Sequence, residues 1–274
     1  MRGSLATLAA AVVVVGALSS ADGAASTTAR VIWSASMETG DLSQWSRNDT
    51  DGGSWDSGQC LRPANGVTTN VAHSGRYSMA MTIDTSGGES GCRQARYEES
   101  KRDKAYYYGA WLYLPTLTKA EDYWNIVQFK SKEEGADGSE PFWVIDLMPR
   151  SRGTLALRLR WKGLVPGPFS GDDEDRRTWS RGVQVPIRRW FHVEIFLRPS
   201  AAHDGRITVW QDGRLLWDFD RVRTRFENGD TRWTVNNYSN ELVPRRATIY
   251  VDDATIGRCR VGPPLRRQAE CVRR

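Results

Sequence analysis

The sequence predicts an all-β protein in which two antiparallel sheets stack as a jelly-roll β-sandwich. Segments that alternate apolar and polar residues recur along the chain, which is the period of a half-buried strand. Turn signals separate these segments, among them Asp212-Gly213, a pair typical of a tight hairpin. Segments with helical spacing are hard to find. Many strands with one buried face each are best accommodated by two sheets packed face to face.

Residues 1–25 are predicted to be a secretory signal peptide, followed by a single domain over residues 26–274. Arg2 supplies a positive start, and the apolar run from Leu5 to Leu18 is short for a membrane span. A short membrane anchor is the alternative. The remaining chain would fit one large β domain or two small ones. We favour one, because no linker, low-complexity tract or internal repeat interrupts it.

Strands are expected in order at 77–84, 106–115, 124–131, 142–149, 154–161, 190–199, 206–212, 214–219 and 247–256. The segment 154–161 illustrates the pattern, because its leucines and Trp161 share one face. Arg158 and Arg160 share the opposite face, which is therefore expected to be wet and basic. The segment 124–131 is different. Alternation places Trp124 and Ile126 on one face together with Gln128 and Lys130, a polar pair that needs an explanation.

Four cysteines are present, at positions 60, 92, 259 and 271. An even number in a secreted chain indicates two disulfides, and three pairings are possible. Proximity in the sequence favours Cys60–Cys92 and Cys259–Cys271. No spacing of cysteine and histidine indicates a zinc site.

The formal net charge is +5, the isoelectric point is about 9.1, and the chain contains 12 tryptophans. A basic secreted protein suits an acidic partner such as a uronate polysaccharide, a nucleic acid or an anionic surface, although a solvated surface explains the charge equally well. Most tryptophans are expected in the core, and an exposed one could stack on sugar. The aromatic residues form no nucleic-acid-binding signature, so neither nucleic acid nor membrane is the expected partner. A monomer is expected.

Several chemistries are excluded by missing motifs. The sequence has no G-x-S-x-G, no H-E-x-x-H and no phosphate-binding glycine loop. The paired acids of a retaining glucanase should occupy one strand as Glu-x-Asp-x-x-Glu, but the segment 142–147 carries a single acid, Asp146. Glycoside hydrolysis by two carboxylates is therefore disfavoured.

The polar residues that remain suit β-elimination in a uronate polymer. That reaction removes the proton next to a carboxylate, so amide or guanidinium donors must stabilise the anion that forms. A base of suitable pKa takes the proton, and a tyrosine can protonate the leaving oxygen. Candidates occur in three segments: Gln94, Arg96 and Glu98; Gln128 and Lys130; Asn236 and Tyr238.

In this order, these segments resemble the motifs of jelly-roll polysaccharide lyases of the alginate lyase-like, heparin lyase I-like and glucuronan lyase-like groups. Arg96-Tyr97-Glu98 resembles the first motif, YGAWLYLP at 108–115 the strand that follows, Gln128-Phe129-Lys130 the Q-x-H motif, and Tyr238 the tyrosine of the last motif. Residues 36–45 and 249–253 resemble the first and last strands. The resemblance covers nearly the whole mature chain and implies a concanavalin A-like sandwich that cleaves acidic polysaccharide without a metal.

The chain departs from the family pattern where Lys130 replaces the histidine of Q-x-H, the expected base. Thr234 and Asn236 also replace the usual lysine and glycine before the late tyrosine. Lys130 could act as a base only if burial or a neighbour such as Arg96 lowered its pKa. Otherwise Tyr238 serves as both acid and base, or the protein is a non-catalytic, lectin-like module that binds acidic glycans.

The resemblance implies catalytic roles for Gln128, Lys130, Tyr238 and Arg96, in which Gln128 and Arg96 neutralise the uronate carboxylate. Substrate contacts are expected from Glu98, Gln94, Asn236, His192, Arg158 and Arg160, with His192 as a possible replacement base. Several of these residues also have a structural alternative: a solvated edge strand for Gln128 and Lys130, a salt bridge for Arg96 and Glu98, a strand-end tyrosine for Tyr238, and a structural or surface role for His192.

No cofactor is required for this route. A structural calcium ion between the first and last strands is possible, with Glu38 and Asp252 as its ligands, because the sandwiches that this chain resembles often hold calcium there. The acidic run 172–175 could also supply oxygen ligands, but the two arginines that follow it favour salt bridges.

Overall fold

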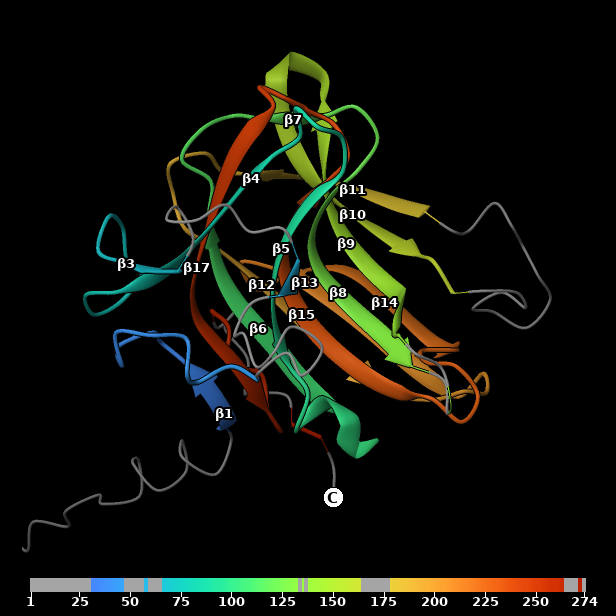
Figure 1. The fold of residues 1–274 in the computed structure, drawn as a ribbon. Coiled ribbons are helices and arrows are strands. Elements are labelled where there is room, and N and C mark those ends of the chain that lie inside the picture. The colour runs from blue at the N-terminus through green and yellow to red at the C-terminus, as the bar shows by residue number, and fades with distance from the viewer. Residues whose placement is uncertain are drawn as a thin grey trace, which may run out of the picture.

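The computed structural model describes residues 31–46, 57–58, 66–132, 135, 138–163, 178–263 and 271–272. Within these ranges two large antiparallel sheets lie one over the other, and a small two-stranded sheet joins β7 (Lys119–Ala120) to β16 (Leu242–Val243) (Figure 1). The predicted all-β sandwich is confirmed. The predicted signal peptide and the acidic run 172–175 lie outside the described residues.

The first large sheet has eight strands, in which β1 also pairs with β17. Its spatial order is β14 (Arg214–Val222), β13 (Gly205–Gln211), β12 (Phe191–Arg198), β6 (Tyr106–Tyr113), β17 (Arg246–Gly257), β4 (Ser78–Asp84) and β3 (Gly66–Thr68), with β1 (Val31–Ala35) beside β17.

The second large sheet has seven strands and carries the candidate site. Its order is β11 (Thr178–Val185), β10 (Thr154–Trp161), β9 (Glu140–Arg150), β8 (Trp124–Lys132), β15 (Asp230–Ser239), β5 (Ser90–Arg96) and β2 (Ser57–Gly58). Two short 3-10 helices, η2 (Ser100–Arg102) and η3 (Ser151–Gly153), follow β5 and β9. None of the helices in the described ranges is long and apolar enough to span a membrane.

The core fills the space between the two large sheets with residues from alternate positions of each strand. Phe129 of β8 faces Trp233 of β15 in register, and Phe129 also packs edge-on against Tyr108 of β6 in the other sheet. Trp233 in turn contacts Trp33 of β1. Every tryptophan with a described side chain is buried or partly buried, which confirms that most of them belong to the core.

Residues 260–262 lie on the outer side of the eight-stranded sheet. Val261 and Gly262 donate their backbone N–H groups to the buried Glu194 of β12, at 2.8 and 3.0 Å, and Arg260 forms an ion pair with the same carboxylate. A disulfide joins Cys259 to Cys271, as predicted. Cys92 is also disulfide-bonded. Its predicted partner, Cys60, lies outside the described residues.

Candidate functional site

A pocket of about 540 Å³ lies over the face of the seven-stranded sheet that points away from the core. The strands β5, β8, β9 and β15 form its floor and walls. Its lining combines three cationic groups, two carboxylates, two phenols and two amides. These residues are Arg93, Lys130, Lys162, Glu89, Glu140, Tyr123, Tyr238, Asn125 and Gln128, with Ser139 and Pro141 at the edge.

A β-bulge in β8 decides which of its side chains reach the pocket. Asn125 is opposite Asp146 of β9, whereas Val127 is opposite Ile145, so β8 carries one extra residue at this point. The bulge sends Asn125 to the same face as Gln128 and Lys130. The expected grouping of Trp124 and Ile126 with Gln128 is therefore wrong, because both apolar side chains belong to the core cluster.

The environment of the pocket alters the ionisation of Lys130. Burial lowers the pKa of its ammonium group to about 8, and the nearby guanidinium groups of Arg93 and Arg232 act in the same direction. The carboxylate of Glu140 opposes them without cancelling their effect. A lysine with this pKa is partly neutral near physiological pH and can accept a proton.

A chain of polar side chains runs along the floor of the pocket. Gln128 Nε2 donates to Asn125 Oδ1, and Asn125 Nδ2 donates to the carboxylate of Asp146. Asp146 also accepts from Arg158 Nε and Arg160 Nη2, each at 3.1 Å. Arg158 and Arg160 thus belong to the polar support of the floor. They were expected to contact substrate directly, but they are not among the residues that line the pocket.

Tyr238 forms the wall contributed by β15, and Gly91 on β5 makes room for its ring. A Cβ atom at position 91 would collide with that ring, so only glycine fits opposite the tyrosine. The Arg93 guanidinium lies 4.5 Å from the centre of the Tyr238 ring, and the Tyr123 ring centre is 5.5 Å away. Tyr123 donates to Glu89 at 2.5 Å. Burial, followed by the hydrogen bond to Glu89, raises the pKa of Tyr238, which keeps its phenol protonated.

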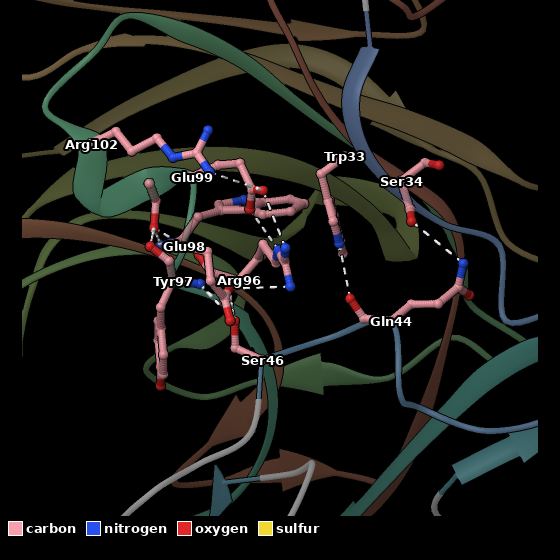
Figure 2. A network of polar contacts seen from close by, with 11 residues as sticks. Trp33, Ser34, Gln44, Ser46, Arg96, Tyr97, Glu98, Glu99 and Arg102 are labelled. Atoms are coloured by element: carbon pink, nitrogen blue, oxygen red, sulfur yellow. Dashed lines mark hydrogen bonds and ion pairs between the residues drawn. The ribbon is translucent and has the colours of Figure 1, made fainter. Parts of the chain in front are cut away.

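Arg96 lies on the opposite face of β5 from Arg93 and does not reach the pocket. Figure 2 shows its guanidinium between the carboxylates of Glu98 and Glu99, beside Trp33. Its Nε donates to Glu99 at 2.6 Å, and its Nη1 is 3.1 Å from Glu98. The ion pair between Arg96 and Glu98, which was the structural alternative to a substrate contact, is thus formed. Gln94, on the same face as Arg96, is buried opposite Val235.

Two further candidates occupy other places. Asn236 is fully buried on the same face as Tyr238 but does not line the pocket, and its side-chain amide has no hydrogen-bond partner among the described residues. His192 belongs to β12 of the other large sheet, where it packs against Trp111 and Gly262. Burial lowers the pKa of its imidazole to about 4. The structure therefore does not bring His192 to Lys130.

Glu38 and Asp252 both hold the turn at residues 73–77. Glu38 Oε1 accepts the backbone N–H groups of Arg76 and Tyr77, and Asp252 Oδ2 accepts those of His73 and Ser74. In the described part of the chain, no group of three His, Cys, Asp or Glu side chains could hold a metal ion. Backbone N–H groups therefore donate to one oxygen of each carboxylate, and calcium binding by Glu38 and Asp252 stays a prediction.

Sequence reasoning missed Arg93, Glu89, Tyr123, Asn125, Glu140 and Lys162, all of which line the pocket. A signal for Arg93 existed, because strand alternation places it on the opposite face from Arg96. The face of β5 that carries Arg93 points to the pocket because Gly91, on that face, leaves room for the Tyr238 ring of β15. This pairing of β5 with β15 cannot be deduced from either segment alone. Asn125 is displaced by the bulge, and the others come from strand ends and loops.

Comparisons with known proteins identify the family of the chain. A family model described as "Polysaccharide lyase" matches residues 37–254, so the chain belongs to this family and the resemblance found in the sequence is confirmed. No curated protein sequence matches significantly.

Solved structures of lyases share the fold at low identity. One is an endo-β-1,4-glucuronan lyase from the fungus Trichoderma reesei, with 18% identity, a TM-score of 0.56, and coverage of 74% of this chain and 94% of the other. Another is a marine PL-14 alginate lyase from Aplysia kurodai, with 16% identity, a TM-score of 0.53, and coverage of 85% and 99%. At these identities the likeness establishes the β-jelly-roll fold.

Proposed function

We propose that the protein is a secreted lyase that cleaves a uronate polysaccharide by β-elimination. The observation that carries the proposal is a half-buried lysine with a pKa of about 8, Lys130, in one pocket with Tyr238 and the amides of Asn125 and Gln128. Family membership supports lyase chemistry, and the two similar structures described above are those of a glucuronan lyase and an alginate lyase. The disulfides are consistent with an extracellular protein.

In the first step, the amides of Gln128 and Asn125 donate hydrogen bonds to the uronate carboxylate. Neutral Lys130 then takes the proton from the adjacent ring carbon. The negative charge that develops on the carboxylate strengthens the amide hydrogen bonds, which lowers the barrier. Lys130 leaves this step as an ammonium ion.

In the second step, the electron pair forms a carbon–carbon double bond and the glycosidic oxygen leaves. Tyr238 donates its phenolic proton to that oxygen, and the Arg93 guanidinium stabilises the phenolate that forms. The products are a new chain end and an unsaturated uronide. Transfer of the proton from Lys130 back to Tyr238, directly or through water, restores the starting state. Lys130 thus replaces the histidine base of the family motif, and His192 has no part in the reaction.

The test is incubation of the mature protein with alginate, glucuronan and heparin while the ultraviolet absorbance of the unsaturated product is recorded. We expect a rise with one of these polymers, and no rise with the Tyr238→Phe or Lys130→Met variants. A flat trace with every polymer contradicts the lyase. If the protein still binds uronate oligosaccharides in that case, the lectin-like alternative replaces it.

A further inference from the structure

Asp146 is a buried carboxylate behind the pocket that the proposed reaction does not use. It has no exposed surface and lies in the middle of β9, between Asn125 of β8 and Arg158 of β10 in register. It accepts hydrogen bonds from Asn125, Arg158 and Arg160. Burial of one carboxylate with two guanidinium groups is costly, so a structural gain alone is a weak reason for such a cluster.

The cluster sets the direction of the hydrogen bonds in the floor of the pocket. A carboxylate paired with guanidinium groups only accepts hydrogen bonds, so Asn125 must turn its NH2 group toward Asp146. Asn125 Oδ1 is then left to accept from Gln128 Nε2. Each NH2 group keeps a second hydrogen, while Gln128 Oε1, at the end of the chain, has no hydrogen-bond partner among the described residues.

The same cluster also braces the segment that precedes β8. Arg158 Nη2 donates to the backbone carbonyl of Asp122 at 3.0 Å, and the Arg160 guanidinium lies 5.5 Å from the centre of the Tyr123 ring. Tyr123 lines the pocket next to Tyr238. Asp146 is therefore connected to the amide floor directly and to the tyrosine wall through Arg160.

We propose that Asp146 is a positioning residue that fixes the amide orientation of Asn125 and, through it, of Gln128, so that both present N–H donors to a substrate carboxylate. The proposal rests on the proposed function of the pocket, because the substrate carboxylate is the group that these donors serve. An asparagine at position 146 could offer either an oxygen or an NH2 group, and the fixed direction would be lost.

The kinetic test is the Asp146→Asn variant, which keeps the size of the side chain. We expect kcat to fall about tenfold or more with a much smaller change in KM, since misdirected amides stabilise the developing charge poorly. Asn125→Ala should lower kcat as well, and the double variant should be no worse than the more impaired single variant, because both changes break one chain. Effects of the two single changes that multiply in the double variant would overturn the proposal.

Asp218→Asn is the matched control. Asp218 forms an ion pair with Arg206 on the eight-stranded sheet, away from the pocket, so loss of the Asp218 charge should leave kcat unchanged.

A second readout does not depend on turnover. In NMR spectra of the wild-type protein, the side-chain NH2 hydrogens of Asn125 and Gln128 should be well separated and slow to exchange with solvent. We expect Asp146→Asn to speed their exchange about tenfold or more, and Asp218→Asn to leave it unchanged. Unchanged exchange in Asp146→Asn would overturn the positioning role.

If Asp146→Asn does not fold, the wild-type spectrum decides, because the hydrogen bond from Asn125 Nδ2 to Asp146 requires slow exchange of the Asn125 NH2 hydrogens, and fast exchange would overturn the proposal. If the wild type cleaves no uronate polymer, the proposed function fails, while the amide signals still show whether Asp146 orients the floor.

Discussion

At the scale of the residue, Lys130 is where the chain departs from its family and where the chemistry is most sensitive to pH. A base must be neutral to accept a proton, and the pKa of Lys130 is lowered to about 8. We therefore expect kcat/KM to rise with pH through about 8 and to fall about tenfold per unit well below it. The measurement is the pH profile of initial rates on the best substrate.

Lys130→His provides the check on that assignment. Imidazole has an ordinary pKa of about 6.5, so the rising limb of the profile should move to lower pH in this variant if activity survives. If the rising limb of the pH profile stays at the same pH in an active Lys130→His variant, the group that titrates is not residue 130.

The same lowered pKa has a consequence for stability. Burial of the charged Lys130 destabilises the folded state, and this loss of stability is present in full below pH 8. It disappears as pH rises to about 10.5, where the lysine of the unfolded chain also loses its proton. Lys130→Met should therefore raise the free energy of unfolding at pH 7 by about 2 kcal/mol while abolishing turnover. Chemical denaturation at pH 7 and above pH 10.5 measures the difference, which should vanish at the higher pH.

Lys119→Met, on an exposed position of β7, is the control and should change the unfolding free energy little at either pH. A loss of stability in Lys130→Met at pH 7 would show that the ammonium group is better solvated than its burial implies.

At the scale of the element, the two faces of β5 have different roles: one stabilises the fold and the other lines the pocket. Arg96 pairs with the buried Glu99 on one face, and Arg93 lies against Tyr238 on the other. Arg96→Met should lower the free energy of unfolding by about 2–3 kcal/mol, because it leaves the buried Glu99 carboxylate with only the 4.0 Å ion pair to Arg102, with little effect on kcat. Arg93→Met should do the reverse: kcat falls and stability changes little.

The two β5 variants form a matched pair, since each removes one guanidinium from the same strand. Denaturant unfolding and steady-state kinetics on both distinguish the roles. A large loss of activity with intact stability in Arg96→Met would restore the substrate contact inferred from the sequence motif.

Strand β8 shows why strand alternation in the sequence does not always predict which face a side chain occupies. Alternation correctly joins Gln128 with Lys130 on one face, because both follow the bulge. It assigns Asn125 to the wrong face, because one extra residue reverses the pattern before Val127. A bulge is stabilised by its partner strands, and here those partners are β9 and β15, far away in the sequence.

At the scale of the whole molecule, the Cys259–Cys271 disulfide and the pocket belong to different parts of the sandwich. Next to Cys259, Glu194 holds the backbone at residues 261–262 on the eight-stranded sheet, whereas the pocket lies on the seven-stranded sheet. Replacing both cysteines by serine should lower the free energy of unfolding by about 2–3 kcal/mol, as expected for a short loop, and leave kcat unchanged. Thermal unfolding and initial rates measure the two effects, and a fall in kcat below the unfolding transition would contradict this independence.

The sequence by itself determined the fold class and a polar face shared by Gln128 and Lys130, and it favoured the Cys259–Cys271 pairing. These follow from period-2 alternation, the spacing of cysteines and short motifs, which are local properties of the chain. Only the tertiary structure decided that Arg93 rather than Arg96 reaches the pocket, that Asn125 joins it, and that His192 belongs to the other sheet. The physical reason is that alternation separates the two faces of a strand without saying which one meets the core. That choice, like the position of a bulge, is made by neighbouring strands distant in sequence.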